Sequence, residues 1–293
     1  MQQYIARYDT LRLLSDSSLF LIRNGLKRFQ AAFGPLEWPL DCFRLVSDMC
    51  NLGLIPLDMI RTDEFSRGFE AVTEYSPEMK RYLLVMRHVP PGWKERSACR
   101  RINFTVAHEL GHITLGHLFI PREAKSDAWL RREDAEADEF ASRLLMPEEL
   151  VLNARFASRA EMAAGFLVSE QACFHRLNNL RRLDRFALPA PVCPRCGNRR
   201  ISPLASFCRA CGAPLGKRLP DRIAAMMPPP LPRCCPACGS DLPPSPEGEC
   251  ESCGMPRRNE CLAEYNQPRH PNPPDALFCE TCGAVTSLSD WKA

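Results

Sequence analysis

The amino-acid sequence predicts an α+β fold, mostly helical with a small sheet, followed by small cysteine-rich modules. Hydrophobic residues recur with the helical period through much of residues 18–180, whereas only Tyr82–Met86 forms the short apolar run typical of a buried strand. The composition changes near Ala187–Val192, beyond which Pro, Gly and Cys dominate. A chain of 293 residues is long enough for roughly two domains, at about 150 residues each.

Helical segments are expected in several places before that change in composition. Ser169 is a good N-cap for the last of them, and Met146-Pro147 ends the one that carries an acidic cluster. We expect helices over residues 18–33, 40–49, 101–118 and 134–145, one beginning at Pro147 and one beginning at Ser169.

The charge balance makes some partners less favoured than others. The 38 basic and 35 acidic residues nearly cancel, so no field of one sign favours nucleic acid or a membrane surface as the main partner. No apolar run reaches the ~18 residues that a membrane-spanning helix needs. Residues 1–16 lack the apolar core and cleavage site of an export signal. We therefore expect a cytoplasmic protein with no membrane partner.

Sixteen cysteines are the compositional anomaly, and twelve of them lie in the last hundred or so residues, mostly in CxxC pairs. In a reducing compartment such pairs favour metal over a disulfide scaffold, which is the alternative. The expected segments are a domain over residues 1–188, a first module over 189–216, a Pro-rich linker over 217–233, a second module over 234–256 and a degenerate third module over 257–293.

The segment His108-Glu109-Leu110-Gly111-His112 is an HExxH motif on a predicted helix. On a helix the two histidines are one turn apart and present their imidazoles to the same side, as zinc ligands do in metallopeptidases. Glu109 is placed to act as the general base on a zinc-bound water. Phe104–Ala107 provide an apolar approach, and Gly111 permits close packing.

A third protein ligand is needed to complete such a site. His117 does not fit the metzincin spacing, so we interpret it as a histidine at the end of the helix. The acidic cluster of the 134–145 helix is the better source, with Asp134 preferred and Glu133 as the alternative. Asp138, one turn after Asp134, is suited to accept a proton from a ligand imidazole.

The rest of that acidic cluster is assigned to a solvated surface. The apolar face of the helix is expected to run through Ala137, Phe140, Ala141, Leu144 and Leu145. Glu136 points away from this face on a helical wheel, and we expect it and Glu139 to face water.

Two segments of the cysteine-rich region have the spacing of a zinc ribbon, in which two CxxC knuckles close one site of four thiolates. The first consists of Cys193, Cys196, Cys208 and Cys211, and the second of Cys235, Cys238, Cys250 and Cys253. The equal spacing marks an internal repeat. Cys234 is left over and is the alternative to Cys235.

The third module has a single knuckle, Cys279 and Cys282, so its other ligands must come from upstream. Cys261 and His270 are the candidates for a site of three thiolates and one imidazole, and a partial site is the alternative. We therefore expect one catalytic zinc and two or three structural ones. Between the first and second modules, Asp221–Arg233 is expected to be extended, because of its proline run.

Taken together, three segments resemble the ImmA/IrrE family of metallopeptidases, over roughly residues 35–185. These segments are RINFTVAHELGH over 101–112, EADEFASRLLMP over 136–147, and VSEQA with HRLNNL over 168–180. The resemblance implies a minimal zincin-like fold with a small sheet over the HExxH helix. It also implies zinc held by His108, His112 and an acid at the position of Asp134, where relatives usually carry Glu.

The resemblance also implies a function. Relatives are hydrolases that cleave a helix-turn-helix repressor and so regulate transcription. Tyr82–Met86 corresponds to the family's edge strand, to which a substrate backbone could add as a further strand. A zinc-dependent sensor with little turnover is one alternative, and a protein that binds nucleic acid through its ribbons is another. Arg199-Arg200, Lys217-Arg218 and Arg257-Arg258 are nearly balanced by acids, so nucleic acid is not the favoured partner.

Overall fold

The computed structural model describes residues 14–63, 70–181, 192–241, 243–264 and 269–291. As far as its residues are described, the chain divides into two compact units. The first covers Met1–Glu148 and Ser158–Ala187, and the second covers Glu149–Ala157 and Leu188–Ala293. The predicted domain boundary near Ala187–Val192 lies outside the described residues, apart from Val192 itself.

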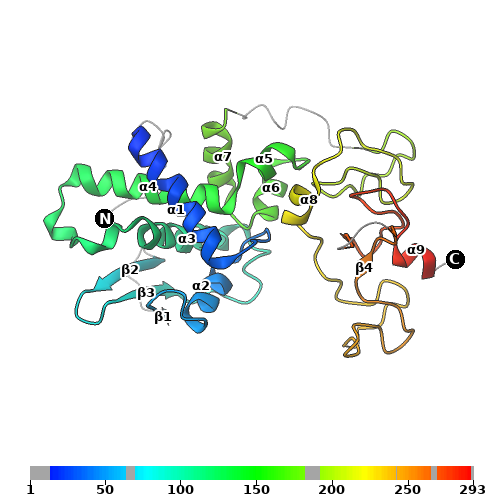
Figure 1. The fold of residues 1–293 in the computed structure, drawn as a ribbon, viewed down its shortest axis with the longest axis horizontal. Coiled ribbons are helices and arrows are strands. Elements are labelled where there is room, and N and C mark those ends of the chain that lie inside the picture. The colour runs from blue at the N-terminus through cyan, green and yellow to red at the C-terminus, as the bar shows by residue number, and fades with distance from the viewer. Residues whose placement is uncertain (1–13, 64–69, 182–191, 242, 265–268, 292–293) are drawn as a thin grey trace. The chain divides into compact units, whose positions relative to one another are not determined.

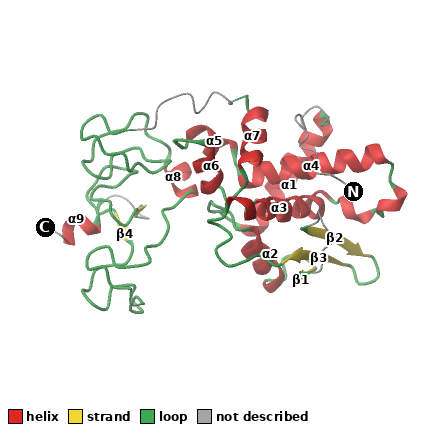
Figure 2. Ribbon diagram, turned by 180° about the vertical axis from the view of Figure 1, so that it is seen from behind, coloured by secondary structure: helices red, strands yellow, loops and turns green. Residues whose placement is uncertain are grey.

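The first unit is mostly helical with one small sheet, which confirms the predicted fold class (Figures 1 and 2). Its helices are α1 (Asp16–Phe33), α2 (Cys42–Asn51), α3 (Arg101–Leu115), α4 (Asp127–Leu145), α6 (Arg159–Gly165) and α7 (Glu170–Asn179), its strands are β1 (Leu57–Thr62), β2 (Ala71–Ser76) and β3 (Arg81–Arg87), and α5 (Glu148–Asn153) follows α4.

Capping residues explain where the observed helices differ from the predicted ones. The helix that we expected over 134–145 begins at Asp127, because the Ser126 side chain caps it by accepting from the backbone N–H of Trp129. The helix expected over 101–118 ends at Leu115, since Gly116 adopts the left-handed conformation, with φ of 79°. Ser169 caps α7 as predicted.

The sheet has the strand order β1-β3-β2, with β1 parallel and β2 antiparallel to β3. The interpretation of Tyr82–Met86 as an edge strand is therefore wrong, because these residues lie in β3, which pairs on both sides. The sequence signal for β1 and β2 was too weak to show that the apolar run had two neighbours. Among the described strands of this sheet, β1 and β2 are the edges.

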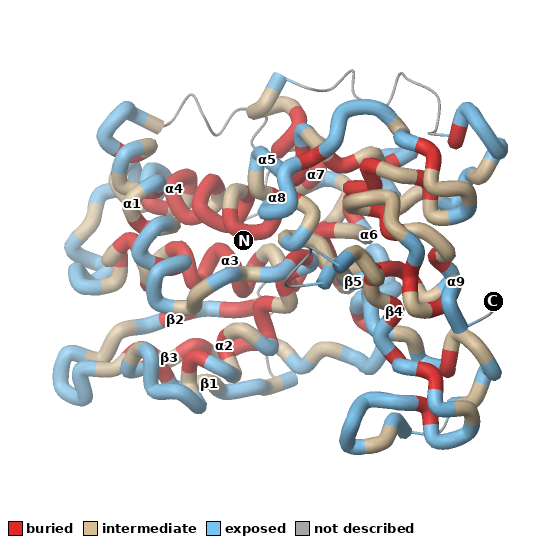
Figure 3. The backbone as a smooth tube through the Cα atoms, turned by 45° about the vertical axis from the view of Figure 1, so that its right-hand side comes forward, coloured by how far each residue is buried: buried red, intermediate tan, exposed pale blue. Residues whose placement is uncertain are grey.

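The core of the first unit lies between α3 and α4, which run side by side and are buried along most of their facing sides (Figure 3). The predicted apolar face of α4 is correct, since each of its five residues is at most 1% exposed. Asn103 ties the start of α3 to two other segments. It accepts from the backbone N–H of Cys42 and donates to the carbonyls of Leu40 and Leu167.

The second unit has little regular structure besides its cysteine knuckles. It contains all of α5 except Glu148, together with α8 (Asp221–Met226), the paired strands β4 (Asn259–Glu260) and β5 (Pro271–Asn272), and α9 (Ser287–Trp291). The expectation of an extended segment over Asp221–Arg233 is wrong for its first half. There α8 forms one helical turn and buries Ile223. No described helix in either unit has the length and apolar character to cross a membrane.

Candidate metal centres

Helix α3 presents the two histidines of the HExxH motif on one side. Their Nε2 atoms lie 3.0 Å apart. Two nitrogens bound to a tetrahedral zinc at about 2.0–2.1 Å would be about 3.3 Å apart, so His108 and His112 need to move by only a few tenths of an ångström. His108 is 7% exposed and the His112 side chain is 13% exposed, so little water competes for their ring nitrogens.

Helix α4 brings an acid to this pair. One ligand atom from each of His108, His112 and Asp134 lies within 4.8 Å of the others, and Asp134 Oδ1 is 3.8 Å from His112 Nε2. Two imidazoles and a carboxylate form a donor set that suits zinc and leaves a position for water. The alternative acid, Glu133, is buried in an ion pair with Lys125 at 2.7 Å instead.

Gly111 allows the two helices to come close enough for this contact. A Cβ atom built on Gly111 would lie 3.1 Å from the Cα atom and 3.2 Å from the carbonyl oxygen of Ala137 in α4. Since both of these atoms belong to the backbone, a side chain at this position would push α4 away from α3. The close packing expected at Gly111 is therefore made with α4.

Asp138 orients one of the two histidines. Its Oδ1 lies 2.7 Å from His108 Nδ1, which leaves Nε2 of that ring facing His112. Burial lowers the pKa of His108, but the charge of Asp138 and the hydrogen bond to it outweigh burial and raise the pKa to about 9. A bound zinc would take the place of that proton on Nε2.

The environment of His112 has the opposite effect. Burial, together with the neighbouring imidazoles of His108 and His117, holds the pKa of His112 well below its usual value. His112 is therefore neutral without any metal, which is the form that binds zinc.

Glu109 lies beside the ligands and is 8% exposed. Burial raises the pKa of its carboxyl group, while His108 and the neighbouring Thr73 of β2 oppose part of that rise. A carboxylate that is desolvated in this way is a stronger base than one in water, as a general base needs to be.

Two glutamates that we assigned to a solvated surface are buried, so that interpretation is wrong. Glu136 is 5% exposed and binds His117 and Ser18, and Glu139 is 2% exposed and pairs with Arg143 at 2.7 Å. Burial would raise the pKa of Glu136, but the hydrogen bonds from His117 and Ser18 outweigh it and lower the pKa. The helical wheel did not reveal the burial of these two glutamates, because it assumes one buried face and α4 is covered on more than one side.

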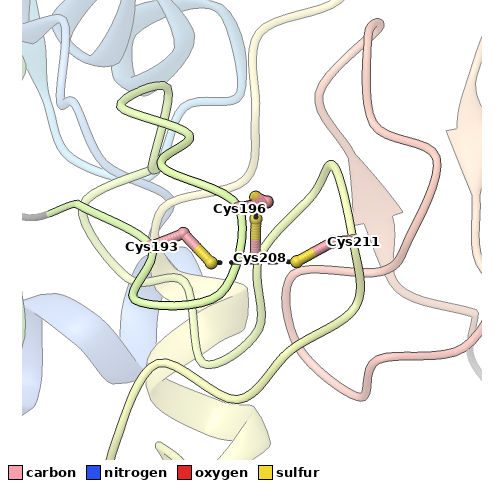
Figure 4. A group of neighbouring side chains, drawn as sticks. All are labelled: Cys193, Cys196, Cys208 and Cys211. Atoms are coloured by element: carbon pink, nitrogen blue, oxygen red, sulfur yellow. Dashed lines mark hydrogen bonds between the residues drawn. The ribbon is translucent and has the colours of Figure 1, made fainter.

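The first cysteine module gathers its four thiols at one point (Figure 4). The Sγ atoms of Cys193 and Cys211 lie 3.7 Å apart, and so do those of Cys196 and Cys208. Four sulfurs at about 2.3 Å from a tetrahedral zinc would be about 3.8 Å apart. The separations are far too long for a disulfide of about 2.05 Å. The geometry is therefore compatible with zinc.

The second module has the same arrangement. The Sγ atoms of Cys235 and Cys253 lie 3.6 Å apart, and those of Cys238 and Cys250 lie 3.7 Å apart. In both modules the surroundings favour ionisation of at least one thiol, and in the second module the pKa of Cys235 is lowered as well as that of Cys250. Burial raises the pKa of Cys208 and of Cys250, but hydrogen bonds, led by those from the backbone N–H groups of the same knuckle, lower each pKa to about 6.

The third module brings its mixed ligands together as well. Cys261, His270, Cys279 and Cys282 place their ligand atoms within 4.8 Å of one another. The pairing of β4 with β5 brings Cys261 beside His270, whose Nδ1 lies 3.7 Å from the sulfurs of both Cys261 and Cys279. The exposed Cys234 belongs to none of the described groups.

The first and third modules are joined by their similar knuckles, which the sequence analysis did not anticipate. The ring of Phe207 lies on Gly283, and the ring of Phe278 lies on Gly212. Backbone N–H groups of each knuckle donate to the other, with Phe207 bonding to Glu280 O and Phe278 to Arg209 O. The Arg209 guanidinium also pairs with the Glu280 carboxylate at 2.8 Å. The repeated pattern Phe-Cys-x-x-Cys-Gly was the available signal.

Part of the first unit matches a known protein family. Residues 94–178 match the family described as the IrrE N-terminal-like domain, Peptidase_M78. This match agrees with the resemblance to the ImmA/IrrE family that the motifs indicated, and the matched residues include both histidines, Glu109 and Asp134.

Among solved structures, a Mycobacterium tuberculosis transcriptional regulator is similar, with 15% sequence identity and a TM-score of 0.41. The similarity covers 66% of this chain and 54% of that one, so the chain spans about half the length of the regulator. No curated protein matches.

Proposed function

We propose that the protein is a zinc-dependent endopeptidase whose reaction takes place at His108, His112 and Asp134. The observation that carries the proposal is the meeting of these three ligand atoms within 4.8 Å, next to a buried carboxylate. The match of residues 94–178 to a peptidase family supports it. The cysteine groups are proposed as structural zinc sites.

The residues of the centre have separate roles in this proposal. Zinc, when bound, would supply a Lewis acid that polarises water and the scissile carbonyl group. Glu109 takes the proton from the attacking water and passes it to the leaving amine. Asp138 holds the ring of His108 through Nδ1, at 2.7 Å.

A peptide substrate would bind along the sheet. Since β3 is an interior strand, an extended peptide can add only to an edge. We assign it to β2, because Thr73 of that strand neighbours Glu109. The substrate class that we propose is a helix-turn-helix repressor in the cytoplasm, on the basis of the family resemblance.

The ribbons are proposed as docking modules for a protein. One arginine of each basic pair has a local partner, since Arg200 pairs with Asp275, Arg218 with Asp221, and the Arg257 side chain donates to the Ser240 carbonyl. Few exposed aromatic side chains accompany them. Residues 1–188 are proposed as the peptidase domain that these modules serve.

The test compares the zinc-loaded protein with a Glu109→Gln variant on a purified candidate repressor. Loss of the general base is expected to reduce cleavage at least about 100-fold, while zinc content stays the same. Glu148→Gln, an exposed carboxylate, is the matched control and is expected to cleave normally. Equal cleavage by wild type and Glu109→Gln would rule out the proposed base. A wild type that binds zinc without cleaving would favour a sensor.

A further inference from the structure

A buried row of polar side chains lies behind His112, on the side away from the other ligands. His117 Nδ1 is 3.0 Å from His112 Nδ1, and His117 Nε2 is 3.0 Å from Glu136 Oε2. Ser18 of α1 donates to the other oxygen of Glu136, at 2.5 Å. His117, Glu136 and Ser18 are 6%, 5% and 3% exposed. Nothing in the proposed reaction requires these three residues.

If both rings are neutral, one assignment of hydrogens satisfies every contact in this row. If His112 binds a metal through Nε2, its hydrogen is on Nδ1 and donates to His117 Nδ1. The hydrogen of His117 is then on Nε2 and donates to the Glu136 carboxylate. Each donor has one acceptor, and the row ends on a carboxylate, which only accepts.

The opposite assignment of the same two neutral rings leaves a conflict. If the hydrogen of His112 were on Nε2, its Nδ1 would need a hydrogen from His117. Nε2 of His117 would then carry a lone pair, and this lone pair would face the Glu136 carboxylate at 3.0 Å. Two acceptors at that distance repel each other, and burial leaves little water to separate them. With His117 neutral, Glu136 therefore selects the tautomer of His112 across one intervening ring.

The backbone of His117 is held in place as well. The buried Lys125 ammonium donates to the His117 carbonyl and pairs with Glu133 at 2.7 Å. The position of the His117 ring is thus set from both ends, by Lys125 on its main chain and by Glu136 on Nε2.

Both zinc-binding histidines are consequently oriented by α4. Asp138 contacts His108 directly, whereas Glu136 acts on His112 through His117. We propose that His117 and Glu136 are positioning residues that hold His112 ready to bind zinc through Nε2 and so raise the zinc affinity of the centre. This inference rests on the proposed metal centre.

Two substitutions of His117 separate positioning from packing. His117→Phe keeps a ring of similar size but removes the acceptor for His112 Nδ1–H. His117→Asn is smaller but can place its carbonyl oxygen near the position of Nδ1. If His117 only fills space, Phe should be the better replacement; if it positions His112, Asn should be.

The measurement uses the full chain labelled with ¹⁵N-histidine, in which six histidines give resolvable imidazole signals. Zinc is supplied in chelator buffers, and the signals of His108 and His112 report the occupancy of this centre separately from that of the ribbons. We expect His117→Phe to weaken zinc binding about 10–100-fold, as loss of such an orienting contact typically does. His117→Asn should recover part of the loss.

Unchanged affinity in a folded His117→Phe variant would overturn the inference, and so would weaker binding by His117→Asn than by His117→Phe. If the His117 variants do not fold, Glu136→Leu is compared with Glu139→Leu, which changes an equally buried carboxylate of α4 that pairs with arginines. Leucine removes the acceptor at either position, so only Glu136→Leu should weaken zinc binding, and equal affinities would overturn the inference. If wild-type His108 and His112 did not respond to zinc, the proposed function itself would fail.

Discussion

The two kinds of metal centre in this chain are built in different ways. The ligands of the first centre project from α3 and α4, whose facing sides form the core of the first unit. The ligands of the ribbons project from loops, and the buried apolar groups around them are few, with Cys208 packed mainly against Cys193 and Ala213 in the first module. We therefore expect that the first centre can form before a metal binds, whereas the ribbons need a bound metal to fold.

This difference predicts which part of the chain uses the free energy of zinc binding to fold. Small modules bury too little apolar surface to offset the entropy of ordering their loops, so a structural metal supplies the missing free energy. A centre on packed helices needs its metal only for chemistry. The carboxylates Asp138 and Glu136 fit this contrast, since they keep the histidines oriented by hydrogen bonds alone.

The largest expected effect is that of removing all zinc. In a strong chelator, we expect the ribbons to lose their structure, because each site loses about 10–16 kcal/mol of metal binding. The helices of the first unit should persist. Hydrogen exchange measured by mass spectrometry checks this, with rapid exchange expected over residues 192–291 and continued protection over 101–145. If the ribbons stayed protected from hydrogen exchange without metal, the proposed difference between the two kinds of centre would be wrong.

A smaller effect is expected from Gly111→Ala. Its methyl group would lie 3.1 Å from the backbone of Ala137, so α4 must move and carry Asp134 with it. We expect a loss of about 1–3 kcal/mol in the free energy of unfolding of the first unit. Zinc binding at His108 should weaken too, while the ribbons keep their zinc. Thermal unfolding and the imidazole signals measure these changes.

Gly25→Ala is the matched control for that prediction. Its methyl group would meet the side chain of Leu115 at 2.7 Å, and a flexible side chain can turn away whereas a backbone cannot. Similar losses of zinc affinity in both variants would show that the spacing of α3 and α4 does not control the centre.

The smallest effect is expected within the second unit, from Gly283→Ala. This residue has φ of 80°, and its methyl group would lie 2.8 Å from the ring of Phe207 in the first module. Gly197→Ala is the control, since Gly197 has φ of 72° with open space around it. In both variants the free energy of unfolding should fall by about 1 kcal/mol, because alanine is strained in the left-handed conformation.

Gly283→Ala should lose more stability than Gly197→Ala, because it also disturbs the contact between the knuckles of the first and third modules. Zinc release from Cys193 and its partners should then become faster, although the substitution lies in another module. A competition assay with a chromophoric chelator measures that rate. Equal rates in the two variants would show that the first and third modules bind their metals independently.

Much of the first centre could be predicted because helical spacing is local. The one-turn separation of His108 and His112 places both rings on one side of α3, and the same rule indicated Asp134 and Asp138 on the next helix. The apolar face of α4 followed from periodicity as well. The burial of Glu136 and Glu139 could not be predicted, since it depends on Ser18, Arg143 and Arg176 from other turns and helices.

The sequence by itself therefore determined the chemistry that each segment carries: an HExxH helix, an acidic helix after it, and cysteine knuckles whose spacing suits a tetrahedral metal. These properties depend on residues within a few turns of each other. Only the tertiary structure decided that β3 is an interior strand, that Glu136 reaches His112 through His117, and that Phe207 lies on Gly283. Such contacts join residues far apart in the chain, and their energies depend on packing that local patterns do not encode.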